Sequence, residues 1–282
     1  MKQNVGEGDG VKMTWLESIV FGMISGFTEF LPLSSLAHQT IYLKLIGEGF
    51  EPAWRLFGHI GSFSALLTVL LPALLRMRRE RLIAAMGRKR RRQPDEGTLA
   101  EYRVLRVATT VMLVLFVAQI WVGTLYQRLW LLAILVGING VMLYIPQFLP
   151  TANKSAKSLS GVDSVLVGLA GGCGVIPGLS TSAFCLSTAQ MLGTERRYTT
   201  ELVLTLNLGA LLAWIVVDAV NVILSGLPQW NLLHGILILL FSFIAAYLGI
   251  KLMRFLAVKT GYSGFAYYCW GVALFTLILY LI

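Results

Sequence analysis

Two short polar motifs inside apolar sequence carry the side chains that could do chemistry. The first reads GFTEFLPLSSLAH, from Gly26 to His38, and the second reads GGCGVIPGLSTSAF, from Gly171 to Phe184. Each sets a proline and a pair of serines among residues that are otherwise mostly Leu, Ile, Val, Phe, Ala and Gly. In hydrocarbon, a broken helix is tolerated only where it is buried in protein or lines a cavity. Two related breaks, one in each half of the chain, therefore predict a binding site at the interface of two repeats.

Glu29 and His38 are the candidate catalytic residues of the first motif. A carboxylate within an apolar segment costs free energy and marks a functional site by default. Glu29 lies three residues before Pro32, so it could bind a divalent cation, act as an acid or base, or cap backbone amides at the break. His38 follows the serines by one helical turn and could act as nucleophile, acid or base, or phosphate ligand. A packing role is the alternative for His38.

Four serines follow the two breaks and are candidate helix caps. Serine at an N-cap satisfies backbone amides that lack a partner, and a helix N-terminus attracts anions. Two such N-termini directed at one point favour a phosphate or diphosphate ligand, although the hydroxyls could simply satisfy the broken helices. The candidates are Ser34, Ser35, Ser180 and Ser182, with Arg55, His59, Asn207 and Asp218 as weaker additions to the cavity wall.

The composition predicts a polytopic membrane protein. Of 282 residues 56% are hydrophobic and only 13% are charged, against about a quarter charged in soluble domains. The net charge of +9 is concentrated in residues 76–106, which hold eleven Lys and Arg against four acids. Between two apolar segments such a run predicts a basic cytoplasmic loop near anionic lipids, and we expect no nucleic-acid partner.

The lengths of the apolar segments predict the topology. Six have the length of about 20 residues that crosses a bilayer once: 57–75, 107–125, 129–149, 201–225, 233–256 and 262–282. The longer segments 15–47 and 162–192 contain the internal prolines and are predicted to be re-entrant hairpins. This arrangement places eighteen of the 23 Lys and Arg on the cytoplasmic side.

We therefore expect an all-α polytopic membrane protein with six transmembrane helices and two re-entrant helical hairpins in an inverted repeat. The chain is expected to form a single membrane domain over residues 1–282. Its halves are expected at approximately 13–150 and 160–282.

At its polar motifs the chain resembles the undecaprenyl-diphosphate phosphatase family, bacterial membrane enzymes associated with bacitracin resistance. The resemblance covers almost the whole length and is strongest in GFTEFLPLSSLAH and PGLSTS. It implies two inverted units, each of one hairpin and three spans. It also implies removal of the terminal phosphate from a C55 polyprenyl diphosphate lipid at the outer face of the bacterial cytoplasmic membrane. A divalent cation, Mg or Ca, would assist, and membrane lipids would surround the protein.

Carried over position by position, the resemblance makes Glu29 the metal-binding residue and a catalytic residue together with His38. The expected substrate-binding residues are Ser34, Ser35, Gly178, Ser180, Thr181 and Ser182. Three positions depart from the family pattern. Ser25 stands where the family has the first of its two glutamates, and Thr181 stands where it has an arginine that holds phosphate. A later Tyr-Arg pair of the family appears here as Tyr268-Cys269. Arg55 is a candidate to replace the phosphate-holding arginine.

These departures leave a second class of function open. A relative without the missing charges could bind or flip a polyprenyl phosphate as a transporter, and transport of another small anion is a third possibility. Phosphoryl transfer depends on positive charge around the transferred group and on carboxylates that hold the metal. Phosphate release from C55 diphosphate, compared with release by Glu29→Ala and His38→Ala, separates hydrolysis from the two other functions.

Overall fold

The structure is a computed structural model that describes residues 13–49, 51–86, 93–118, 128–150, 153–224 and 232–282. Across these ranges it is helical, and its β-type pairing is limited to one isolated bridge between Lys154 and Thr194. By length and composition, five of the described helices can cross a membrane: Pro52–Ala85, Leu129–Phe148, Arg196–Leu224, Leu232–Lys259 and Gly264–Leu281. The prediction of an all-helical, multi-pass membrane protein is confirmed.

Residues 15–46 form a broken helix pair, which we call hairpin 1. Helix α1 (Trp15–Phe30) begins at a capping box made by Thr14 and Glu17, and α2 (Ser35–Ile46) doubles back beside it. The chain leaves the helix at Leu31, whose backbone is extended (φ −67°, ψ 153°). Proline disfavours helical backbone in the residue before it, so Pro32 explains where α1 ends. The predicted break is confirmed.

Residues 161–191 form the second broken pair, hairpin 2. Helix α7 (Gly161–Gly172) begins at a capping box and continues into a short 3-10 turn, η5 (Cys173–Val175). The backbone becomes extended at Ile176, the residue before Pro177, and α8 (Thr181–Met191) then returns beside α7. The second predicted break is confirmed, with the same proline effect as its cause.

The two hairpins repeat the same local structure. Each matched residue of hairpin 2 lies the same number of positions after its counterpart in hairpin 1. In each, a buried serine donates to the carbonyl of the capping residue four positions earlier. A serine caps the second helix, and a glycine with positive φ follows that helix. The matched pairs are Thr14 and Ser160, Ser18 and Ser164, Ser34 and Ser180, and Gly47 and Gly193. The two hairpins are thus versions of one structural unit.

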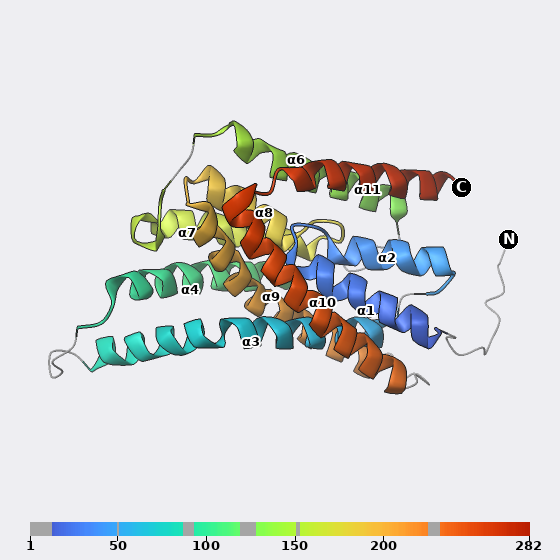
Figure 1. Cartoon of the computed structure of the whole chain (residues 1–282), viewed down its shortest axis with the longest axis horizontal. Coiled ribbons are helices and arrows are strands. Elements are labelled where there is room, and N and C mark those ends of the chain that lie inside the picture. Colours follow the sequence, from blue (N-terminus) through green and yellow to red (C-terminus); the bar gives the residue numbers. More distant parts are fainter. Residues whose placement is uncertain (1–12, 50, 87–92, 119–127, 151–152, 225–231) are drawn as a thin grey trace.

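Figure 1 shows the two hairpins entering from opposite ends of the molecule, with their tips near its middle. Hairpin 1 packs through α1 against α10 (Leu232–Lys259), and hairpin 2 packs through α7 against α4 (Glu96–Phe116). Helix α3 (Pro52–Ala85) contacts α9 (Arg196–Leu224), and α6 (Leu129–Tyr144), which runs into the 3-10 turn η3 (Ile145–Phe148), contacts α11 (Gly264–Leu281). We call the residues between the two helices of each hairpin (31–34 and 173–180), together with the helix ends that adjoin them, tip 1 and tip 2. The largest hydrophobic core joins Leu31 and Leu33 of tip 1 to Leu186 of α8 and Leu132 of α6.

Glycines bring each hairpin into backbone contact with its partner helix. A Cβ added at Gly26 would lie 2.1 Å from the Ser242 carbonyl oxygen on α10, and one at Gly22 would lie 2.6 Å from that of Ile238. On α7, a Cβ at Gly168 would lie 2.6 Å from the Ala108 carbonyl oxygen on α4. Small residues of this kind let helices approach closely in membranes, where van der Waals contact replaces the hydrophobic effect.

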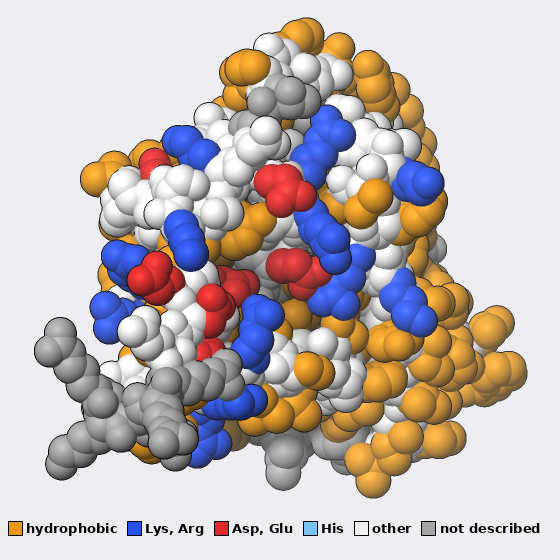
Figure 2. Space-filling view, turned by 60° about the vertical axis from the view of Figure 1, so that its left-hand side comes forward, with side chains coloured by type: hydrophobic (Ala, Val, Ile, Leu, Met, Phe, Trp, Pro, Cys, Tyr) orange, Lys and Arg blue, Asp and Glu red, His pale blue; other side chains and the backbone are white. Residues whose placement is uncertain are grey.

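Most of the described residues in the basic segment 76–106 are helical. Helix α3 continues through Ala85, and α4 begins at Glu96. Arg76 and Glu101 form an ion pair at 3.5 Å, and the Arg81 guanidinium lies 4.0 Å from the Tyr102 ring centroid. Arginine, leucine and alanine favour helix, in agreement with the helical structure of its two described ends. Figure 2 shows Lys, Arg, Asp and Glu side chains gathered at this end of the molecule.

The expected span 107–125 is described only in part. Helix α4 ends at Phe116, and residues 119–127 lie outside the described ranges.

Asp95 makes an acid-sensitive cap for α4. The Thr98 hydroxyl, at 2.5 Å, and its amide, at 2.9 Å, both donate to Asp95 Oδ2, which lowers the pKa of this carboxyl. A group with a lowered folded-state pKa contributes stability above its unfolded pKa, and this contribution disappears as the pH falls through the folded value. We expect the melting temperature in detergent to fall less between pH 6 and pH 3 in Asp95→Asn than in the wild type. Asparagine caps equally well without titrating. Identical acid sensitivity in the two proteins would contradict this role.

Candidate active site

A polar cavity of about 60 Å³ lies where the two hairpin tips meet. Helices α3 and α9 complete its wall with Arg55, His59, Asn207 and Trp214. Seven of the site residues predicted from the sequence line it: Glu29, Ser34, Ser35, Gly178, Ser180, Thr181 and Ser182.

Tip 1 presents the N-terminus of α2 to the cavity. The Ser34 hydroxyl caps this helix by accepting from the Ala37 amide at 3.3 Å. Ser35 Oγ accepts from Gln39 Nε2 at 3.1 Å and donates to the Ser25 carbonyl at 3.4 Å. The hydroxyl of Ser35 therefore connects the start of α2 to the neighbouring helix α1.

Tip 2 presents the N-terminus of α8 and is held by one asparagine. Ser180 caps α8 by accepting from the Ala183 amide at 3.2 Å. The fully buried Asn139 of α6 donates to the Gly178 carbonyl at 2.6 Å and accepts from the Ser180 amide at 3.0 Å. Gly178 has φ +103°, a conformation that residues with a side chain rarely adopt. Asn139 thereby fixes the loop that directs α8 toward the cavity.

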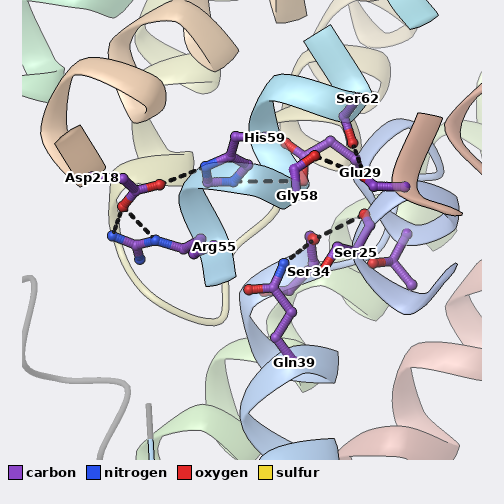
Figure 3. Close-up of polar contacts among 12 residues, drawn as sticks. Ser25, Glu29, Ser34, Gln39, Arg55, Gly58, His59, Ser62 and Asp218 are labelled. Atoms are coloured by element: carbon purple, nitrogen blue, oxygen red, sulfur yellow. Dashed lines mark hydrogen bonds and ion pairs between the residues drawn. The ribbon is translucent and has the colours of Figure 1, made fainter. Parts of the chain in front are cut away.

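A buried charge cluster forms the wall contributed by α3 and α9 (Figure 3). Asp218 is fully buried and accepts from Arg55 Nε through Oδ1 at 2.6 Å. Its Oδ2 lies 2.7 Å from His59 Nδ1. Arg55 and His59 are one helical turn apart, which places both on the same face of α3. The Trp214 ring packs on this pair, 5.1 Å from the Arg55 guanidinium carbon and 6.1 Å from the His59 ring.

Glu29 faces this cluster from tip 1. Its side chain retains 14% exposure, and its Oε2 lies 4.0 Å from His59 Nε2. Because His59 Nδ1 donates to Asp218, the other ring nitrogen, Nε2, is the one that faces Glu29. The imidazole thus lies between two carboxylates, a geometry suited to holding a proton or a charged ligand near Glu29.

The sequence of this chain matches a known protein family over most of its length. Residues 18–275 match the family described as bacitracin resistance protein BacA. The chain belongs to the BacA family.

Proteins named undecaprenyl-diphosphatase are similar to this chain at low sequence identity. A protein of Methanobrevibacter smithii named undecaprenyl-diphosphatase is 27% identical over 273 residues, covering 93% of this chain and 96% of its own. A protein of the same name from Nocardioides sp. is 28% identical and covers 94% and 96%. A third, from Micrococcus luteus, is 29% identical over 71% of this chain and 73% of its own.

Two of the expected site residues of this BacA chain do not line the cavity. His38 Nδ1 donates to the Ser34 carbonyl at 2.7 Å, and its Nε2 accepts from the Tyr268 hydroxyl of α11 at 2.9 Å, with the two rings stacked. Ser25 lies on α1, and its buried hydroxyl has no hydrogen-bond partner among the described residues. His38 therefore joins hairpin 1 to α11, while Ser25 lies behind the tip.

Other polar residues that line or support the cavity were weaker candidates in the sequence analysis or were not proposed there. Arg55, His59 and Asn207 line it, and Asp218 supports two of them from behind. Asn139 and Gln39 were not suggested as site residues. A polar side chain inside a long apolar segment was the available signal for Asn139 and Asp218.

The donor set fits a divalent cation only when the ligand supplies part of the coordination. Within the described ranges, no group of three or more His, Cys, Asp and Glu residues is arranged to hold a metal. Glu29 contributes a carboxylate to the cavity wall. Mg²⁺ in phosphate-processing proteins is commonly held by one or two carboxylates together with substrate phosphates. Glu29 matches that pattern.

Proposed function

We propose that this BacA-family protein is an undecaprenyl-diphosphatase, which hydrolyses the terminal phosphate of undecaprenyl diphosphate and releases undecaprenyl phosphate. The observation that carries the proposal is the meeting of both hairpin tips at one polar cavity that contains Glu29 and Arg55. The full-length relatives named undecaprenyl-diphosphatase support the same substrate. The product would be the lipid carrier reused in cell-wall synthesis.

The helix N-termini provide the phosphate-binding surface in this proposal. Backbone amides at the starts of α2 and α8, next to the caps Ser34 and Ser180, attract a phosphate because N-termini carry partial positive charge. The hydroxyls of Ser35, Thr181 and Ser182 add donors around it. Gly178 keeps tip 2 compact enough for the backbone to approach the ligand.

Glu29 is the proposed acid–base and cation-binding residue. Water attacks the terminal phosphorus, the bond to the bridging oxygen breaks, and undecaprenyl phosphate leaves with that oxygen. Glu29 is placed to accept the proton that water releases, and His59 lies within 4.0 Å to share it. We propose that Glu29 and the diphosphate oxygens together hold Mg or Ca, which would neutralise charge on the phosphates. His38 is proposed to keep tip 1 in position through Tyr268.

We further propose six membrane crossings and two re-entrant hairpins in an inverted repeat. Several helix contacts support this arrangement because each has a counterpart when the two halves are exchanged. Exchanging hairpin 1 with hairpin 2, α3 with α9, α4 with α10 and α6 with α11 turns the α1–α10 contact into the α7–α4 contact and the α3–α10 contact into the α9–α4 contact. The concentration of basic residues at one end supports a cytoplasmic location for that end. The cavity would then open toward the outer side of a bacterial cytoplasmic membrane.

Phosphate release from purified protein tests the proposed function. With undecaprenyl diphosphate in detergent and added Mg or Ca, we expect steady release of inorganic phosphate. We expect EDTA to stop release and excess cation to restore it, because one carboxylate alone holds a divalent ion weakly. Undecaprenyl monophosphate serves as the control substrate and should release none. Binding of the lipid without release above Glu29→Gln would replace hydrolysis with a carrier function.

A further inference from the structure

We infer that Arg55, held in place by Asp218, is the guanidinium that binds the substrate's phosphates in this chain. The inference rests on the proposed function and identifies the positive charge that phosphoryl transfer needs. The resemblance implies a phosphate-holding arginine on tip 2, where this chain has Thr181. Arg55, at the start of α3, is the only Lys or Arg among the described residues that line the cavity.

The position of Arg55 is fixed from three sides. Asp218 binds its Nε at 2.6 Å and also contacts Nη2, so the carboxylate holds one edge of the guanidinium. Trp214 lies 5.1 Å from the guanidinium carbon and limits rotation of the group. Arg55 itself is 5% exposed. A guanidinium carries its donors in a rigid fork and can bind a carboxylate along one edge and a phosphate along another.

Asp218 is a positioning residue in this scheme because it acts through its neighbours. It does not line the cavity, yet its two oxygens orient Arg55 and His59, one each. A buried ion pair contributes little net stability, since desolvation opposes the Coulomb attraction. Burying a cation and a carboxylate beside this polar cavity is therefore better explained by ligand binding than by stability.

Tip 2 is closely packed at the position where the resemblance places the arginine. A Cβ added at Gly174 would lie only 2.8 Å from the Thr181 amide nitrogen and would also clash with Thr181 Oγ1. Thr181 and Arg55 nevertheless line the same cavity from different elements. A guanidinium delivered from either position would reach the same ligand, which makes relocation of the charge a direct test.

The test compares Arg55→Gln with the double variant Arg55→Gln/Thr181→Arg. Glutamine can still donate to Asp218 but cannot carry charge, so we expect kcat/KM for undecaprenyl diphosphate to fall about 100-fold, the usual effect of losing one transition-state donor. We expect the double variant to regain at least about tenfold of this loss, because the charge returns to the cavity from tip 2. Asp218→Asn should raise KM and lower kcat, and its loss should also be partly reversed by Thr181→Arg.

Arg254→Gln is the matched control. Arg254 makes an equally close interhelical ion pair with Glu201, at 2.7 Å through both nitrogens, but lies outside the cavity. We expect Arg254→Gln to keep kcat/KM within about threefold of the wild type, since surface-accessible pairs contribute little. Melting temperatures of all variants report whether a loss of activity reflects unfolding.

Binding of inorganic pyrophosphate separates this inference from the proposed function. We expect pyrophosphate to raise the melting temperature of the wild type but not that of Arg55→Gln. Hydrolysis that persists within about threefold in Arg55→Gln would overturn the role of Arg55 while leaving the phosphatase intact. Absence of hydrolysis together with Arg55-dependent pyrophosphate binding would overturn the phosphatase and leave the anion site. Absence of both activities would overturn both.

Discussion

Glu29→Gln should lower phosphate release from undecaprenyl diphosphate by roughly 10³-fold, the middle of the range for a lost acid–base residue. The amide keeps the shape of the side chain but can neither accept the proton of the attacking water nor bind a cation with a full charge. Glu29 is the carboxylate that lines the cavity between the tips, with His59 Nε2 at 4.0 Å. The measurement is kcat/KM with Mg titrated for each protein, and the variant should also need more Mg for half-maximal rate.

His38→Ala is the control for Glu29→Gln. His38 faces Tyr268 rather than the cavity, so its loss should loosen hairpin 1 and lower the rate much less than Glu29→Gln does. Equal losses in the two variants would contradict the placement of the reacting centre between the tips. They would move it toward the surface that α2 shares with α11.

Gly26→Ala should lower the stability of the folded protein by about 2 kcal/mol, the typical cost of forcing a methyl group into a well-packed interface. The new Cβ would lie 2.1 Å from the Ser242 carbonyl oxygen and 2.9 Å from the Ala246 nitrogen, both backbone atoms of α10. Backbone cannot rotate away as a side chain can, so α1 must move off α10 and carry tip 1 with it. The melting temperature in detergent and kcat/KM should therefore fall together.

Gly271→Ala on α11 is the matched substitution without crowding. A Cβ at Gly271 meets no atom within 4 Å among the described residues, and alanine favours helix over glycine by up to about 1 kcal/mol. We expect this variant to melt at or above the wild-type temperature. A similar loss of stability in both glycine variants would show that the α1–α10 contact is not the cause.

The sequence alone predicted the two helix breaks and their caps because these features depend on local chemistry. Proline removes an N–H group and constrains the residue before it, and a serine three residues before a free amide caps a helix wherever the helix lies. Ser34 and Ser180 therefore occupy their predicted roles as helix caps. Composition likewise predicted the helical membrane class. The helical extent of the basic segment 76–106 was not predicted, although its arginine, leucine and alanine content favours helix.

Only the tertiary structure decided which polar residues share the cavity. Arg55 and His59 on α3 meet Asp218 on α9, a pairing between residues far apart in the chain that no local pattern encodes. His38 lies one helical turn after the serines, and this spacing suggested that it would face the cavity. In the structure His38 instead contacts Tyr268 of α11 and does not line the cavity, because the packing of hairpin 1 decides which side of α2 faces which neighbour. Local propensity determines where helices begin and end, whereas packing between helices determines which of their faces meet, and this chemistry depends on those faces.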